Sequence, residues 1–101
     1  MSKEYEIDIL NRFSKTEIYN IQQKIIEFLG HDGCRLFQDL KDENGTVWVT
    51  RTINGIHQSM SFYPGMQIRN MVNESFPGIV KLFDDYGEYE DFIAKIVDDI
   101  F

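Results

Sequence analysis

Two Asn-Gly pairs constrain the fold of this chain more than any other feature of its sequence. Asn44-Gly45 and Asn54-Gly55 separate three segments that are rich in apolar, aromatic and β-branched residues. An Asn-Gly pair favours the type I′ turn, whose twist matches that of the two strands it joins. The sequence therefore predicts a three-stranded antiparallel meander, with strands at 34–41, 46–53 and 56–63.

The turns also predict which residues face each other across the strands, and so which face of the sheet each occupies. A two-residue turn at 54–55 places Ile53 opposite Ile56 and Arg51 opposite Gln58. A similar turn at 44–45 places Gln38 opposite Arg51, although a longer loop at 42–45 is the alternative there. One face of this sheet is then a predicted core face, formed by Leu36, Leu40, Val47, Val49, Ile53, Ile56, Met60 and Phe62.

Helices are predicted before and after the meander in the sequence. Ser14 and Glu17 have the spacing of a capping box, and the apolar residues after them recur at helical spacing up to Gly30, which predicts a helix at 15–29. A short helix is predicted around 68–72, ended by Pro77, and a further helical turn at 79–83. The last predicted helix, 88–101, has one apolar face, formed by Tyr89, Phe92, Ile93, Ile96, Val97 and Ile100.

These elements predict a two-layer α+β fold in a single globular domain, 1–101. Residues 5–9 alternate apolar and charged side chains, as a half-buried strand does. This strand would join the meander as a fourth, and the predicted order is β-α-β-β-β-α-α. With 43% hydrophobic residues, the 101-residue chain can close one core without disulfides.

The expected compartment follows from cysteine use and from the apolar segments of the chain. Cys34 is the only cysteine, which fits a reducing environment. The N-terminal residues lack the apolar run of a signal peptide, and the sequence contains no apolar stretch of the length that spans a bilayer. We expect a soluble cytoplasmic protein.

The net charge of −7 is concentrated at the C-terminal end of the chain. Residues 84–101 hold seven acids and one base, Lys95, whereas residues 1–83 hold ten acids and nine bases. Direct contact with nucleic acid is disfavoured, because phosphate binding needs clustered Lys and Arg. An anionic membrane is disfavoured for the same reason.

A basic protein is the partner that this acidic segment fits. The candidate partner-binding residues are Asp84, Asp85, Asp91, Asp98 and Asp99. Acids at the C-terminal end of a helix are unfavourable, because the helix dipole is negative there. Asp98 and Asp99 therefore suggest an external basic surface, and the alternative is a solvated helix end whose acids keep the protein soluble.

Two other groups of residues are candidate ligand sites. The polar row Gln38, Arg51 and Gln58 crosses the predicted core face, where it forms either a ligand site or a patch beyond the helix edge with Arg51 reaching solvent. The opposite face would carry the aromatic and imidazole side chains of Phe37, Trp48, His57 and Tyr63. This second face would bind a small molecule, form a homodimer, or lie covered by a helix.

No catalytic or metal-binding arrangement is predicted. Cys34 and His57 would lie on opposite faces of the sheet, which separates a nucleophile from its base. His31, Asp32, Cys34 and His57 lack the paired short spacings of a zinc site, and the sequence contains no cofactor-binding loop. We expect a protein that is not an enzyme and that holds no cofactor.

In size, charge and predicted architecture the chain resembles bacterial immunity proteins and phage-encoded inhibitors. That resemblance implies a non-enzymatic inhibitor that binds a basic nuclease or nucleic-acid-binding protein. It covers no specific motif, so it assigns no functional residues. The alternative function is a small-molecule binding or accessory domain that uses the aromatic sheet face, or a homodimer.

Overall fold

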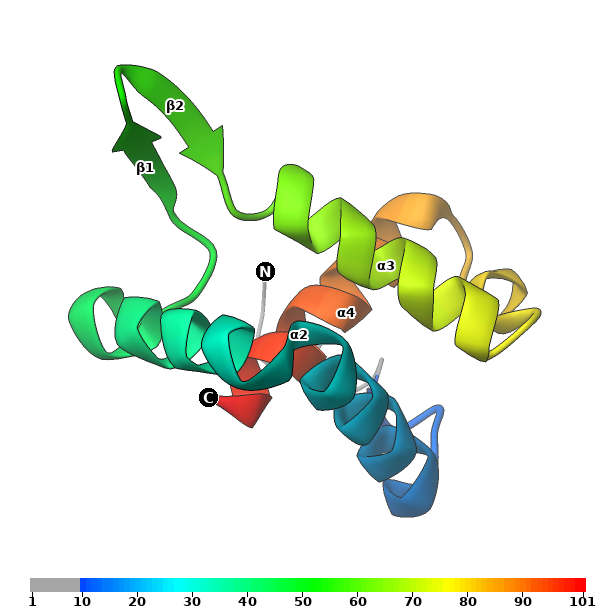
Figure 1. Cartoon of the computed structure of the whole chain (residues 1–101). Coiled ribbons are helices and arrows are strands. Elements are labelled where there is room, and N and C mark those ends of the chain that lie inside the picture. The colour runs from blue at the N-terminus through cyan, green and yellow to red at the C-terminus, as the bar shows by residue number, and fades with distance from the viewer. Residues whose placement is uncertain (1–9) are drawn as a thin grey trace.

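The computed structural model describes residues 10–101, and over this range the chain is mostly helical (Figure 1). Its described elements are, in chain order, α2 (Lys15–Asn44), β1 (Thr50–Ile53), β2 (Ile56–Ser59), α3 (Tyr63–Ser75), the 3₁₀ helix η1 (Ile79–Leu82) and α4 (Tyr86–Ile100). The described sheet has only two strands. The predicted three-stranded meander and the order β-α-β-β-β-α-α are therefore wrong, and the strand predicted at 5–9 lies outside the described residues.

The first half of α2 confirms the predicted helix and its capping box. The amide of Glu17 donates to the Ser14 hydroxyl at 3.1 Å, and the amide of Ser14 donates to the Glu17 carboxylate at 2.9 Å. Ile21 and Ile25, four residues apart on the predicted apolar face, are buried in the core. Local sequence therefore fixes where this helix begins.

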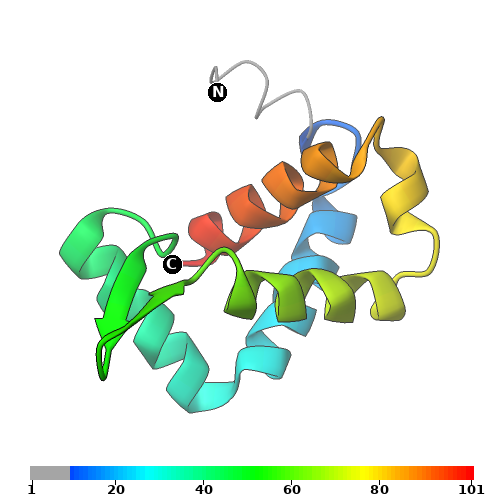
Figure 2. The same cartoon turned by 90° about the horizontal axis from the view of Figure 1, so that it is seen from above.

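Gly30 bends α2 but does not end it. Its backbone angles, φ 70° and ψ −177°, lie in a region that only glycine occupies without strain. The helix resumes directly and runs to Asn44, in a direction that differs clearly from that of its first half (Figure 2). Residues 34–41 are thus helical, and the strand predicted there is wrong.

The sequence of 34–41 fits either structure, and packing decides between them. Leu36, Gln38 and Leu40 would share one face of a strand, whereas Phe37 and Leu40 have the spacing of one helical face. Both Phe37 and Leu40 are buried. The ring of Phe37 packs edge-on against Trp48 and Phe101, with centroid separations of 6.4 and 5.7 Å.

The two Asn-Gly pairs adopt different structures. Asn54 and Gly55 both have positive φ, 53° and 79°, and they form the predicted two-residue hairpin turn. At 44–45 only the glycine has positive φ, and its amide donates to the carbonyl of Lys41 at 2.8 Å. Gly45 is therefore the C-cap of α2, and the first predicted hairpin is wrong.

The register predicted for the second hairpin is confirmed over β1 and β2. Ile53 pairs with Ile56, and Arg51 pairs with Gln58. One backbone bond extends the pairing, from the amide of Met60 to the carbonyl of Val49 at 2.9 Å. Beyond it the strands separate, because the chain from Phe62 onward turns into α3.

The predicted core face of the sheet is wrong. Leu40, Val47 and Met60 are buried, but the side chains of Ile56 and Phe62 are 70% and 71% exposed. The hairpin projects from the helices instead of forming a layer beneath them (Figure 1).

The core lies between α2, α3 and α4, which contact one another in pairs (Figure 2). The apolar face predicted for the last helix is confirmed, because five of its six residues are buried: Tyr89, Phe92, Ile93, Ile96 and Val97. Phe13 stacks on Phe92 with a centroid separation of 4.7 Å. None of the described helices is both long and apolar enough to cross a lipid bilayer.

Candidate functional site: an acid-lined hollow along α4

The N-terminal end of α4 is fixed by its own carboxylates. Asp85 is the N-cap, and its side chain accepts from the amide of Glu88 at 2.8 Å. The carboxylate of Glu88 accepts from the amide of Asp84 at 3.2 Å and forms an ion pair with Arg12. Negative charge at this end is favourable, because the helix dipole is positive there.

Glu88 is buried and ionised at neutral pH. The hydrogen bond from Arg12 lowers the pKa of its carboxyl group, and the bond from the Asp84 amide adds to this effect. Burial opposes the shift, but the charge-assisted bond outweighs it. Glu88 therefore holds the segment around Arg12 against the start of α4.

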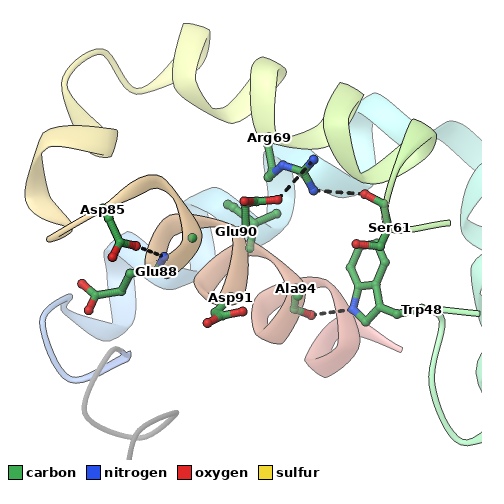
Figure 3. Close-up of a pocket in the computed structure, with 10 residues that line it drawn as sticks. Trp48, Ser61, Arg69, Asp85, Glu88, Glu90, Asp91 and Ala94 are labelled. Atoms are coloured by element: carbon green, nitrogen blue, oxygen red, sulfur yellow. Dashed lines mark hydrogen bonds and ion pairs between the residues drawn. The ribbon is translucent and has the colours of Figure 1, made fainter. Parts of the chain in front are cut away.

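A hollow of about 440 Å³ runs along the same face of α4 (Figure 3). It is lined by residues of α4, α3 and the hairpin region: Trp48, Ser61, Arg69, Asp85, Gly87, Glu88, Glu90, Asp91, Ile93 and Ala94. Asp85 and Glu88 lie at one end and Trp48 at the other (Figure 3). We call this surface the α4 hollow.

The only arginine among the lining residues, Arg69, is held by neighbouring groups. Its side chain comes from α3 and is buried, with 9% of the residue exposed. One terminal nitrogen donates to the carbonyl of Ser61 at 3.1 Å, and the other lies 3.7 Å from the carboxylate of Glu90. Its Nε is buried and has no hydrogen-bond partner.

Two further bonds fix the walls of the α4 hollow. Trp48 donates its indole N–H to the carbonyl of Ala94 at 3.0 Å, which holds the ring beside α4. Tyr89, buried behind the hollow, donates its hydroxyl to the carbonyl of Arg69 at 2.7 Å. Burial raises the pKa of Tyr89, so its hydroxyl stays protonated and keeps this link between α3 and α4.

The charge of the α4 hollow is negative. Four carboxylates line it, those of Asp85, Glu88, Glu90 and Asp91. Two guanidinium groups contact them, Arg69 at Glu90 and Arg12 at Glu88. A cationic group is therefore the charged ligand that this arrangement favours.

The five acids predicted to bind a partner do not share one position on α4. Asp85 and Asp91 line the α4 hollow, and Asp84 is exposed beside it. Asp98 and Asp99 lie near the other end of the helix, about 20 Å from Asp85 at 1.5 Å of rise per residue.

The carboxylate of Asp98 is bonded to other groups of the same chain. Its carboxylate accepts from the Thr46 hydroxyl and from the buried amide of Val47, both at 3.2 Å. It also lies 3.4 Å from Nζ of Lys41, which donates to the backbone carbonyl of Asp98 at 2.8 Å. Asp99 pairs with Lys95 one turn earlier at 2.8 Å. Lysines of the chain itself therefore compensate the acids at this helix end.

The other two predicted groups are dispersed by the fold. Phe37 and Trp48 pack together at the core, whereas His57 and Tyr63 are exposed on and beside the hairpin. The polar row is reduced to the pair of Arg51 and Gln58. Gln38 belongs to α2, where it donates to Asp42 at 3.0 Å.

Cys34 and His57 belong to different elements and have separate partners. The thiol of Cys34, on α2, contacts the carbonyl of Ile26 at 3.7 Å, and burial raises its pKa. The imidazole of His57, on β2, shares a hydrogen bond of 3.1 Å with the hydroxyl of Thr52. Within residues 10–101, no three His, Cys, Asp or Glu side chains are grouped so that they could hold a metal ion.

Sequence reasoning missed Arg69, Glu90 and Trp48 as parts of one site. No local motif connects them, because they come from three separate segments of the chain. Comparison with known proteins finds no matching family model, no matching curated protein and no matching solved structure.

Proposed function

We propose that this protein is a non-enzymatic binding module that engages a basic protein, with the α4 hollow receiving a lysine or arginine side chain of that partner. The observation that carries this proposal is the line of four carboxylates along a hollow of about 440 Å³. A nuclease or another nucleic-acid-binding protein is the kind of basic partner that this charge would suit.

The aromatic end of the hollow supports a cationic ligand. Trp48 lines it, and its N–H is already used by Ala94, so the ring is held in place. Carboxylates at one end and an indole at the other are complementary to the charged head and apolar stem of a long basic side chain.

The site is also largely preorganised. Asp85 caps α4, Glu88 bonds to Arg12, and Trp48 bonds to Ala94 before any partner is present. Binding then freezes few rotamers of this protein, which reduces the entropic cost of association. The net charge of −7 would in addition speed the encounter with a basic protein.

The chemistry of the described side chains gives less support to catalysis or to a small-molecule site. Burial raises the pKa of the Cys34 thiol, which disfavours the thiolate that a nucleophile needs. The aromatic face proposed for a small molecule has lost its geometric basis, because Phe37 is buried in the core.

The test compares two variants that change charge equally. Glu90→Gln with Asp91→Asn neutralises two carboxylates of the α4 hollow, and Asp32→Asn with Asp39→Asn neutralises two exposed carboxylates of α2. A partner is captured from extract of the native host with the wild-type protein, and its Kd is measured for all three proteins. We expect the hollow variant to bind at least about tenfold more weakly, a loss of about 1.4 kcal/mol.

The α2 variant should keep wild-type affinity apart from a small general effect of charge. Circular dichroism of each variant checks that the fold is retained. Equal weakening of both variants, or no weakening of the hollow variant, would show that the α4 hollow is not the binding site.

A further inference from the structure

Strand β2 has a free edge, and the register identifies the peptide groups on it. In an antiparallel pair, hydrogen-bonded and non-hydrogen-bonded residue pairs alternate along the strands. The bond from the amide of Met60 to the carbonyl of Val49 makes that pair a bonded one. The pairs at Ser59 and His57 are then non-bonded, so their peptide groups point away from β1.

Apart from its short length of four residues, this edge lacks the features that normally prevent strand pairing. Proteins protect edge strands with charged side chains, prolines, bulges or a covering element. The four residues of β2, Ile-His-Gln-Ser, carry no proline and no permanently charged side chain. The sheet of the described chain ends at β2, with no third strand beside it.

Exposed apolar side chains lie next to the same edge. Ile56 and Phe62 are 70% and 71% exposed, and Tyr63 is 52% exposed. All three line a second hollow, of about 440 Å³, together with Asn54, His57, Gln58 and Ser59. Contiguous exposed apolar side chains mark interaction surfaces, whereas isolated ones are ordinary.

The charge distribution around the hairpin favours a second copy of the chain as the partner that pairs with the β2 edge. Residues 46–73, which contain the whole hairpin and most of α3, include no Asp or Glu, while all seventeen acids of the chain lie elsewhere in the sequence. Two copies with a net charge of −7 each repel through most of their surfaces. The hairpin end lets them meet with their acidic segments kept apart.

We propose that this protein forms a twofold-symmetric homodimer by antiparallel pairing of β2 with β2 of a second copy. Pairing centred on Gln58 places His57 of each copy opposite Ser59 of the other copy. The peptide groups of His57 and Ser59, which point away from β1, then form backbone hydrogen bonds between the two copies. The product is a four-stranded sheet with closed symmetry. The carboxylates of the α4 hollow belong to α4 and its N-cap and not to the paired strands.

A charge-swap experiment tests this pairing at its centre. Gln58→Lys places like charges opposite each other at the twofold axis, and so does Gln58→Glu. Arg51, the partner of Gln58 on β1, adds to the repulsion in the lysine variant and offsets part of it in the glutamate variant. Each variant alone should therefore dimerise more weakly than the wild type by sedimentation and light scattering, and the lysine variant should show the larger loss. Mixing the two variants should restore the dimer, because the opposed charges are then of opposite sign.

The matched control is Thr50→Lys, which adds the same charge to β1 and should leave the wild-type dissociation constant within about threefold. We expect at least about a tenfold weaker dimer for Gln58→Lys. The Glu90→Gln, Asp91→Asn variant should dimerise as the wild type does, which separates this proposal from the proposed function.

Three results would overturn the proposal. The first is a wild-type protein that stays monomeric up to millimolar concentration, whether or not its β2 edge binds an unrelated extended peptide. The second is a dimer that Gln58→Lys leaves intact. The third is that the Gln58→Lys and Gln58→Glu variants do not associate when mixed, although circular dichroism shows that each variant is folded.

Discussion

Adjacent residues of the same type have different roles at the end of α4. Asp98 connects α4 to the segment after α2 through Thr46, Val47 and Lys41. Asp99 has a single described ion pair, with Lys95 on its own helix. The sequence predicts both as unfavourable acids at a helix end. For Asp98 the compensating lysine, Lys41, is distant along the chain and leaves no local signal, whereas Lys95 lies only four residues before Asp99.

Replacing each of these two residues by alanine should therefore have unequal effects on stability. Asp98→Ala leaves the buried amide of Val47 without its acceptor, which costs about 1–3 kcal/mol. Asp99→Ala removes a surface ion pair within one helix and should cost about 0.3–0.5 kcal/mol. Urea denaturation of the two variants measures both values, and equal losses would contradict the role assigned to Asp98.

Glu88 should make folding stability depend on pH in the acidic range. Its pKa is lower in the folded protein than in the unfolded chain, because the folded state bonds the carboxylate to Arg12. The ionised form then stabilises the fold at a pH above the unfolded pKa, and this contribution is lost as the pH falls through the folded pKa. The stability gap between wild type and Glu88→Gln should shrink as the pH falls from about 5 to about 3.

Arg12→Gln supplies the control for this measurement. In that background the Glu88→Gln substitution should change the pH dependence much less, because the main cause of the lowered pKa has been removed. A stability gap that stays constant across the acidic range would rule out Glu88 as the titrating group.

At the scale of elements, the sequence predicts the beginning of α2 better than its end. The capping box at Ser14 depends on neighbouring residues alone, and it is present. The end of α2 was misplaced because Gly30 has the conformation of a helix break while the helix continues beyond it. Asn44-Gly45 was misread for the same kind of reason, since a left-handed glycine serves both a helix C-cap and a hairpin.

The bend at Gly30 gives a prediction about the stability of α2. No atom lies within 4 Å of where a Cβ would stand, so Gly30→Ala tests backbone conformation alone. An alanine there should cost about 1–3 kcal/mol, because this region is sparsely allowed for residues with a Cβ. Asp32→Ala, at a neighbouring exposed helical position, should change the free energy of unfolding by less than about 0.5 kcal/mol.

Denaturation of the Gly30 and Asp32 variants decides whether the bend is a strained glycine conformation. If Gly30→Ala were as stable as the wild type, α2 would have to pass through position 30 as an ordinary helix. The relation between its two halves, and with it the packing of Phe37, would then differ from the structure described.

At the scale of the whole molecule, the uneven charge is predictable and the architecture is not. Counting charges needs no fold, so the sequence alone identifies 84–101 as the acidic segment. The helical core depends on whether residues 34–41 pack as a helix or a strand, which only contacts with Trp48 and Phe101 decide. The α4 hollow could not be predicted, because its walls come from segments that meet only in the folded chain.

The two proposed surfaces divide the molecule by charge. The α4 hollow is acidic and would bind a basic protein, whereas the acid-free hairpin would bind a second copy. A dimer of this kind would present two α4 hollows, so a partner with two basic sites would bind more tightly than one with a single site.

The most direct test of the central claim is to map, by NMR, the amides of the labelled protein that shift when the captured basic partner is added. Binding at the α4 hollow predicts the largest shifts at 84–94, at Trp48 and at the side chain of Arg69, with little change in the first half of α2. These shifts should be lost in the Glu90→Gln, Asp91→Asn variant. Shifts confined to the hairpin or to α2, with 84–94 unchanged, would contradict the proposed function.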